Sequence, residues 1–277
     1  MGLRINTNVP SLSAQRTLGE NNIKKENTLA KLSSGSRINR SADDAAGLAI
    51  SEKLKGQIKS LNQANRNAND GISMIQTAEG GLNETSNILI RMRELAVQSA
   101  SDTVTDKERA FTDLEYQNLK KEIQRISQVT EFNGKKLLDG SAEKYDFQIG
   151  INNNQFEDRI TYDGNMINSG VSNLGVAELG VENKDGAQQS LAKLDNAIQA
   201  ISGQRAELGA KQNRLASTVT NLQVTTENLS AANSRIRDTD YAQASAQNTK
   251  LNILTQAGTS VLGQANASAQ TALKLIG

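Results

Sequence analysis

The sequence predicts a mainly α-helical fold, in which long antiparallel helices pack as a coiled-coil-like bundle with one small β-hairpin region. Three observations support this fold class. Pro10 is the only proline among 277 residues, and a proline inside a helix costs about 3 kcal/mol. Aliphatic residues recur at alternating spacings of three and four, the period of a helix with a packed seam. Aromatic residues make up only 3% of the chain, so aliphatic side chains must form the core.

The N-terminal 40 residues carry a sparse apolar stripe and a local excess of positive charge. Seven basic and two acidic residues lie there, which leaves a difference of +5. The apolar residues have helical spacing, so we expect a helix with one apolar face. They are Ile5, Val9, Leu12, Ile23, Leu29 and Leu32.

The longest expected helix runs from about Ala45 to Gln98, roughly 80 Å at 1.5 Å per residue. Gly80-Gly81 lies inside it and should soften it, at about 1 kcal/mol per glycine relative to alanine. One register holds for the whole length. Its apolar members are Leu54, Ile58, Leu61, Ala68, Ile72, Ile75, Leu82, Leu89 and Ala96.

A shorter helix follows the expected loop 101–105, because Thr105 to Glu108 resembles a capping box. Between about 131 and 186 the pattern changes. Asn133-Gly134 and Asp139-Gly140 are turn signals. Apolar residues alternate over 145–151 and return over 156–162, which predicts a hairpin. The glycine-rich stretch 165–186 is weakly patterned, so we expect loops there.

The strongest periodic signal lies between Leu191 and Ile236, where polar residues such as Arg205 occupy some seam positions. Such residues weaken a seam but fix its register. Together with the stripe of 45–98, this signal predicts the core of a bundle of long helices. We assign that core to Ile58, Leu61, Ile72, Ile75, Leu82, Ile198, Ile201, Leu208, Leu215 and Leu222.

The last 40 residues contain only four charged side chains, and Leu251, Leu254, Val261 and Leu275 keep the helical register there. A helix with so little charge must be buried, yet two isolated terminal helices bury too little to be stable alone. Two arrangements are open from the residues alone. The ends pack on neighbouring copies, or they close a single-chain bundle with the central helices.

The composition excludes several kinds of function. The chain has no Cys, His or Trp, which removes thiol nucleophiles, imidazole bases and the usual zinc ligands. We therefore predict no catalytic site, no metal site and no cofactor. A net charge of +1 argues against nucleic acid as the main partner. No stretch approaches the roughly 18 apolar residues of a membrane span, and the first residues lack the apolar region of a cleaved secretory signal.

Several long motifs, in order along the chain, resemble those of bacterial flagellin. The resemblance covers about residues 1–135 and 190–277. It is carried by Asn6-Thr7-Asn8, Leu32-Ser33-Ser34-Gly35-Ser36-Arg37-Ile38-Asn39, Asp43-Asp44-Ala45-Ala46-Gly47-Leu48-Ala49-Ile50, Arg93-Glu94-Leu95-Ala96-Val97-Gln98, Phe132-Asn133-Gly134 and Gln256-Ala257-Gly258-Thr259-Ser260-Val261-Leu262.

The resemblance implies a subunit that self-assembles into the bacterial flagellar filament. It implies an inner terminal-helix domain, residues 1–43 and 238–277, whose ends are largely disordered in the free monomer and fold on assembly. It also implies an outer α-helical domain, residues 44–237, with its hairpin region at about 131–186. Only about 55 residues separate the helical blocks here, so we expect a short form without extra outer domains.

The same resemblance implies secretion through the flagellar type III apparatus without a cleaved signal. The implied partners are copies of the chain itself, an export chaperone, the filament cap and hook-junction proteins. A flagellin-like hook–filament junction protein is the alternative, although it usually diverges near Leu95 and in the C-terminal block. The residues that we expect to pack between subunits in the filament core are Ile5, Val9, Leu12, Ile23, Leu251, Leu254, Val261 and Leu275.

A host partner is also implied. The surface around Arg91, Leu95 and Glu115 resembles the site that an animal Toll-like receptor recognises on flagellins. The same residues would serve subunit contacts in the filament.

Overall fold

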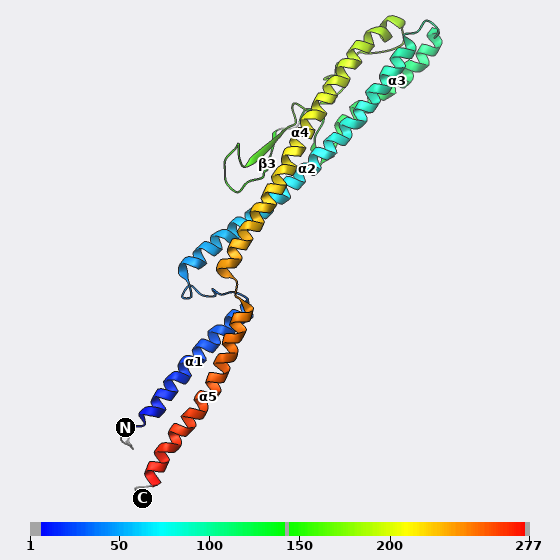
Figure 1. Ribbon diagram of the computed structural model, residues 1–277. Helices are drawn as coiled ribbons and strands as arrows, with labels where there is room; N and C mark the ends of the chain where they lie inside the picture. The colour runs from blue at the N-terminus through cyan, green and yellow to red at the C-terminus, as the bar shows by residue number, and fades with distance from the viewer. Residues whose placement is uncertain (1–6, 142–143, 275–277) are drawn as a thin grey trace. The chain divides into compact units, whose positions relative to one another are not determined.

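The computed structural model describes residues 7–141 and 144–274, with side chains described as far as residue 268. The chain divides into a central unit, residues 57–227, and a terminal unit, which comprises the chain up to residue 56 and from 228 onward (Figure 1). The elements are α1 (Val9–Ser34), α2 (Ala45–Ser99), α3 (Asp106–Val129), β1 (Glu131–Phe132), β2 (Lys135–Lys136), β3 (Lys144–Gln148), β4 (Arg159–Asp163), α4 (Lys184–Arg237) and α5 (Tyr241–Lys274).

The central unit is built on α2, α3 and α4, which lie side by side in Figure 1. The predicted stripes of α2 and α4 face inward. Glu79 and Arg205, both at polar register positions, meet across the seam at 3.9 Å, and Arg93 pairs with Asp195 at 2.6 Å, so the two helices are antiparallel. Ile72 and Ile198 are half-buried and pack against the core, and Ile58 is half-buried nearer the start of α2. The fully buried members of the predicted set are Leu61, Ile75, Leu82, Ile201, Leu208, Leu215 and Leu222.

The turn from α2 to α3 is fixed at both ends by side chains. The backbone N–H of Thr105 donates to the Glu108 carboxylate at 2.8 Å, which confirms the predicted capping box. Arg109 is buried and donates to the carbonyls of Ser99 and Ser101, each at 2.9 Å. These carbonyls lie at the C-terminal end of α2, where no helical N–H is left to bind them. The first turn of α3 is therefore held rigidly.

Two antiparallel hairpins follow α3. Asn133 and Gly134 both have positive φ, 51° and 74°, the conformation of a type I′ turn, and this turn joins β1 to β2. The sequence predicted the turn but not its strands. In the second hairpin β3 pairs with β4, Phe147 facing Ile160. The strands are shorter than predicted because the carboxylate of Asp158 accepts N–H groups of the connecting loop.

The segment 164–183 differs from expectation. It has no regular structure, yet most of its large apolar residues are buried in the main core, and α3 binds its backbone through side chains. Asp113 accepts the N–H of Val181 at 2.8 Å, Gln124 accepts that of Val171 at 3.2 Å, and Lys120 donates to carbonyls of the same segment. The buried members are Ile167, Val171, Leu174, Val176, Leu179 and Val181.

The glycine pair inside α2 has two different environments. A Cβ on Gly81 would lie 2.6 Å from the Leu138 side chain and 2.8 Å from Thr130, whereas a Cβ on Gly80 would meet nothing within 4 Å. We expect Gly81→Val to destabilise the protein by about 2 kcal/mol, because overpacking outweighs the gain in helix propensity. Gly80→Val should change stability by less than about 0.5 kcal/mol. Urea unfolding of the two variants tests this, and equal effects would contradict the packing described.

The terminal unit contains α1 and α5, which lie antiparallel. The Asn8 amide donates to the Ala265 carbonyl at 2.9 Å and the Ser11 hydroxyl donates to Asn266 at 2.8 Å. Asn8 also caps α1 by accepting the N–H of Ser11. Cα atoms of the two helices approach within 8 Å, which small residues in the seam allow. Among the described residues no helix is long and apolar enough to cross a membrane.

Candidate subunit interface

The seam between α1 and α5 is poor in large apolar side chains. The positions shielded from solvent repeat every three or four residues on both helices. Among the described residues of this seam, Leu251 is the only large apolar side chain that is buried, with 2% exposed. Because small and polar residues bury little apolar area, this helix pair is weakly held by its own contacts. The seam consists of Ser11, Ala14, Leu18, Asn21, Lys25, Thr28 and Leu32 on α1, and Ala244, Asn248, Leu251, Thr255, Gly258, Leu262 and Ala265 on α5.

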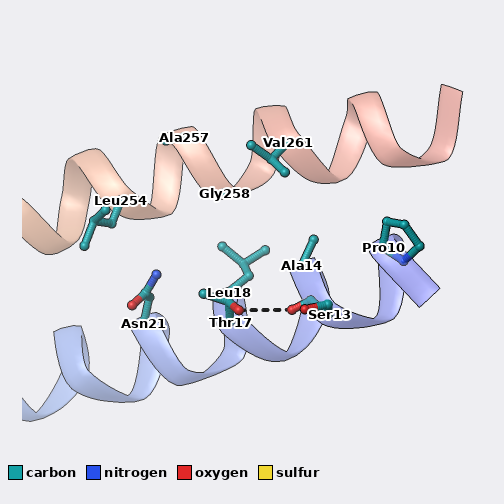
Figure 2. A pocket seen from close by; sticks show the side chains of 10 residues that line it. All are labelled: Pro10, Ser13, Ala14, Thr17, Leu18, Asn21, Leu254, Ala257, Gly258 and Val261. Atoms are coloured by element: carbon teal, nitrogen blue, oxygen red, sulfur yellow. Dashed lines mark hydrogen bonds between the residues drawn. The ribbon is translucent and has the colours of Figure 1, made fainter. Parts of the chain in front are cut away.

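An open groove of about 440 Å³ runs between the two helices. In Figure 2 Leu18 points from α1 toward α5, where Gly258 leaves room for it. A Cβ on Gly258 would lie 3.3 Å from the Leu18 side chain. The residues that line the groove are uncharged, so it suits apolar side chains. Its lining is Pro10, Ser13, Ala14, Thr17, Leu18, Asn21, Leu254, Ala257, Gly258 and Val261.

The apolar residues that the sequence assigns to subunit packing lie mostly outside this seam. Those that the structure describes, apart from Leu251, are exposed by 40–61%. Their helical spacing places them on one stripe of each helix, and exposed apolar stripes on helices are typical of interaction sites. Ile5 and Leu275 lie outside the described residues. We call the exposed residues, together with the exposed Ile253 that the sequence did not assign, the terminal stripes: Val9, Leu12 and Ile23 on α1, and Ile253, Leu254 and Val261 on α5.

Charge distinguishes the two helices. Within Tyr241–Lys274 the only charged residues are Lys250 and Lys274, so burying α5 removes few charges from water. α1 carries Arg16, Lys24 and Lys25 among others. Of the two helices, α5 is thus the better suited to full burial.

A compact joint connects α1 and α5 within the terminal unit. The N–H of Arg37 donates to the Arg237 carbonyl at 2.6 Å, and the N–H of Thr239 donates to the Gly35 carbonyl at 2.9 Å. The guanidinium of Arg37 donates to the Ile236 carbonyl at 2.7 Å. These bonds tie the C-terminal end of α1 to the break between α4 and α5.

The core of the joint is Ile38, which is 1% exposed and packs against Gly47, where a Cβ would lie 2.8 Å from its methyl group. Asp44 accepts the N–H of Gly47 at 2.8 Å. The N–H groups of Arg40 and Asn39 lower the pKa of the Asp43 carboxyl. In the sequence Arg37 and Ile38 were part of the flagellin-like motif 32–39, but no structural role was assigned to them. The signal available in the sequence was Gly35, a residue type that often ends helices, three positions before the isolated apolar residue Ile38.

The three residues assigned to a host receptor are not equally accessible. Arg91 and Glu115 form an ion pair at 3.0 Å across α2 and α3, with both side chains about half exposed. Its hydrogen bond to Glu94, and to a smaller extent that to Glu115, raises the pKa of Arg91. Leu95 is 2% exposed and belongs to the core, so its placement on the surface was wrong. Its position on α2 places the Leu95 side chain in the core together with residues of α3 and α4. In the described residues no cluster of acidic side chains could hold a metal ion.

Comparisons with known proteins agree across nearly the whole chain. The sequence pattern of the bacterial flagellin N-terminal helical region matches residues 5–143, and that of the bacterial flagellin C-terminal helical region matches residues 191–276. The chain is 44% identical to a flagellin of Halalkalibacterium halodurans, over 98% of this chain and 99% of that one. It is 43% identical to the flagellar filament 33 kDa core protein of Treponema phagedenis, over the same shares.

A solved structure shows the same fold. The crystal structure of Bacillus cereus flagellin aligns with a TM-score of 0.51 and 32% identity, over 61% of this chain and 94% of that one. The alignments with these flagellar relatives cover 98% of this chain and 99% of each relative, which confirms the predicted short form. The chain belongs to the bacterial flagellin family.

Proposed function

We propose that this chain is a structural subunit of the flagellar filament and that copies pack together through the terminal stripes. The observation that carries the proposal is the exposure of Leu12, Ile23 and Val261 on helices that bury little against each other. Such helices gain stability by packing on further helices. A second copy can cover the stripes and fill the groove between α1 and α5. The role is structural rather than catalytic, as in the family.

The inner domain of the filament, in this proposal, comprises residues 1–43 and 238–277, and the outer domain residues 44–237. The compact terminal unit is larger, because it also holds the start of α2 and the end of α4. The joint at Gly35 to Asp44 lies where the proposed boundary falls. The alternative role as a junction protein is not favoured, since the relatives aligned over the whole chain carry flagellin and filament core names.

Seeded assembly tests the filament role. Purified chain is added to short sheared filaments, and growth is followed by electron microscopy. We expect long tubes that lengthen from the seeds. A junction protein would add at most a few layers, and failure to elongate at any concentration would contradict the proposal.

Export and assembly partners are further parts of this proposal. We infer that the chain leaves the cell through the flagellar type III apparatus without a cleaved signal, aided by an export chaperone. The filament cap and hook-junction proteins would then meet its ends. The absence of Cys suits a chain that travels unfolded.

Recognition by a Toll-like receptor would use Arg91 and Glu115 without the buried Leu95. Both charged side chains are available on the surface of the single chain. We expect the pair Arg91→Ala and Glu115→Ala to lower activation of receptor-bearing reporter cells by at least about tenfold, the loss of two interface charges. The matched control is Arg125→Ala with Glu122→Ala, another exposed ion pair on α3. Equal loss in both variants would argue against the assignment.

A further inference from the structure

Two phenylalanines are unusually exposed in the central unit. Phe156 is 81% exposed and Phe111 is 75% exposed, more than any other large hydrophobic residue described. The chain has only four phenylalanines, and the other two, Phe132 and Phe147, pack against the core. Exposed aromatic residues on rigid supports are the usual anchors of protein interfaces.

Phe156 lies at the tip of the β3–β4 hairpin, on a loop that is rigidly held. The buried carboxylate of Asp158 accepts the N–H of Asn154 at 2.9 Å, and the Asn154 side chain accepts the N–H of Phe156 at 3.1 Å. Gln148 donates to two carbonyls of the same loop. We call residues 151–157 the hairpin tip. The loop is already ordered in the single chain, so little conformational entropy is lost when Phe156 binds a partner.

Phe111 lies on the first turns of α3, which the capping box and Arg109 hold in place. Leu114 is 65% exposed on the same helix. Lys107 is exposed one turn before Phe111. We call Lys107, Phe111 and Leu114 the α3 patch.

The charges beside the two aromatics are opposite. Glu157 follows Phe156 and Lys107 precedes Phe111, and both side chains are exposed. In the described part of the chain neither is within 4.0 Å of an opposite charge. Glu157 on the tip and Lys107 on the patch therefore form one complementary pair of charges beside two apolar side chains.

We propose that the hairpin tip of one copy packs on the α3 patch of a second copy, with Phe156 beside Phe111 and Glu157 facing Lys107. This inference rests on the proposed filament role. Because the two surfaces differ, each copy can give its tip to one neighbour and its patch to another. Such a heterologous contact does not close on itself unless the rotation forms a ring, and it propagates along a filament.

The absence of Cys allows a clean cross-linking test. Gln155→Cys places a thiol on the tip and Ala110→Cys one beside the patch, both at exposed positions that leave the phenylalanines intact. Filaments of the double variant are first verified by microscopy and then treated with a short bifunctional maleimide. We expect a ladder of covalent oligomers on a denaturing gel, and only monomer from unpolymerised chain.

The controls separate this contact from others. Gln155→Cys alone and Ala110→Cys alone should give no ladder. The pair Gln155→Cys with Gln128→Cys, at an exposed position near the other end of α3, should give none either. Intact filaments without a ladder, or dimers from Gln155→Cys alone, would overturn the proposal while leaving the filament role standing. Wild-type chain that forms no filaments would overturn the filament role itself.

Charge exchange gives a second readout. Glu157→Lys should raise the concentration of unpolymerised chain at equilibrium by roughly two- to fivefold, the effect of one exposed ion pair. Adding Lys107→Glu should restore the wild-type value. If the double variant leaves as much unpolymerised chain as Glu157→Lys alone, the two charges do not face each other across the contact.

Discussion

Replacing Leu12 and Ile23 together by glutamate is expected to abolish filament growth. Both side chains are more than half exposed in the single chain, so the variant should fold normally. In the proposed packing of the filament both side chains are buried between copies, so each substitution removes about 2 kcal/mol of apolar burial before the cost of burying a charge is added. The concentration needed for polymerisation should therefore rise at least about a thousandfold.

The control for this variant lies on the same helix. Gln15→Glu with Asn22→Glu adds the same two charges at exposed polar positions. That variant should polymerise at a concentration within about tenfold of wild type, since exposed charges interact weakly. Normal seeded growth of the Leu12 and Ile23 variant, measured by sedimentation, would show that this face of α1 stays in solvent.

Ile38→Ala is expected to open the joint of the terminal unit. Removing a buried isoleucine side chain costs about 3 kcal/mol, and the hydrogen bonds of Arg37 and Thr239 depend on the loop that Ile38 anchors. Hydrogen exchange at these two amides should become roughly a hundredfold faster. Assembly should weaken as well, because the joint fixes where α1 ends and α5 begins.

Ile50→Ala is the matched comparison. The residue lies in the same unit and is 51% exposed, so its loss should cost less than about 1 kcal/mol. Exchange at the Arg37 and Thr239 amides should then stay near the wild-type rate. Equal acceleration by both substitutions would show that the joint is not organised around Ile38.

The long helices were predictable because their signal is local and repeated. The apolar stripe predicted a helix whose ends lie within one residue of those observed for α2. Thr105 and Glu108 marked the start of α3. Periodicity placed Arg205 at a polar seam position, but its partner Glu79 on α2 became visible only in the structure. Such patterns suffice wherever one face of a helix must be buried for its whole length.

What the sequence could not supply depends on contacts between distant segments. The segment 164–183 is buried without regular structure, because α3 supplies partners for its backbone. Leu95 lies beside exposed charged residues in the sequence, so only the arrangement of three helices shows that it faces inward. For α1, spacing identified the stripe of Val9, Leu12 and Ile23 but not that the opposite face of the helix packs against α5.

Burial of the terminal stripes on assembly is the central claim, and thiol labelling of Val261→Cys measures it directly. The chain has no other Cys, and Val261 is 55% exposed in the single chain. The thiol should react rapidly with a maleimide in free chain and at least about tenfold more slowly in filaments, since reaction there needs local opening. Equal labelling rates in free chain and in filaments would contradict the account.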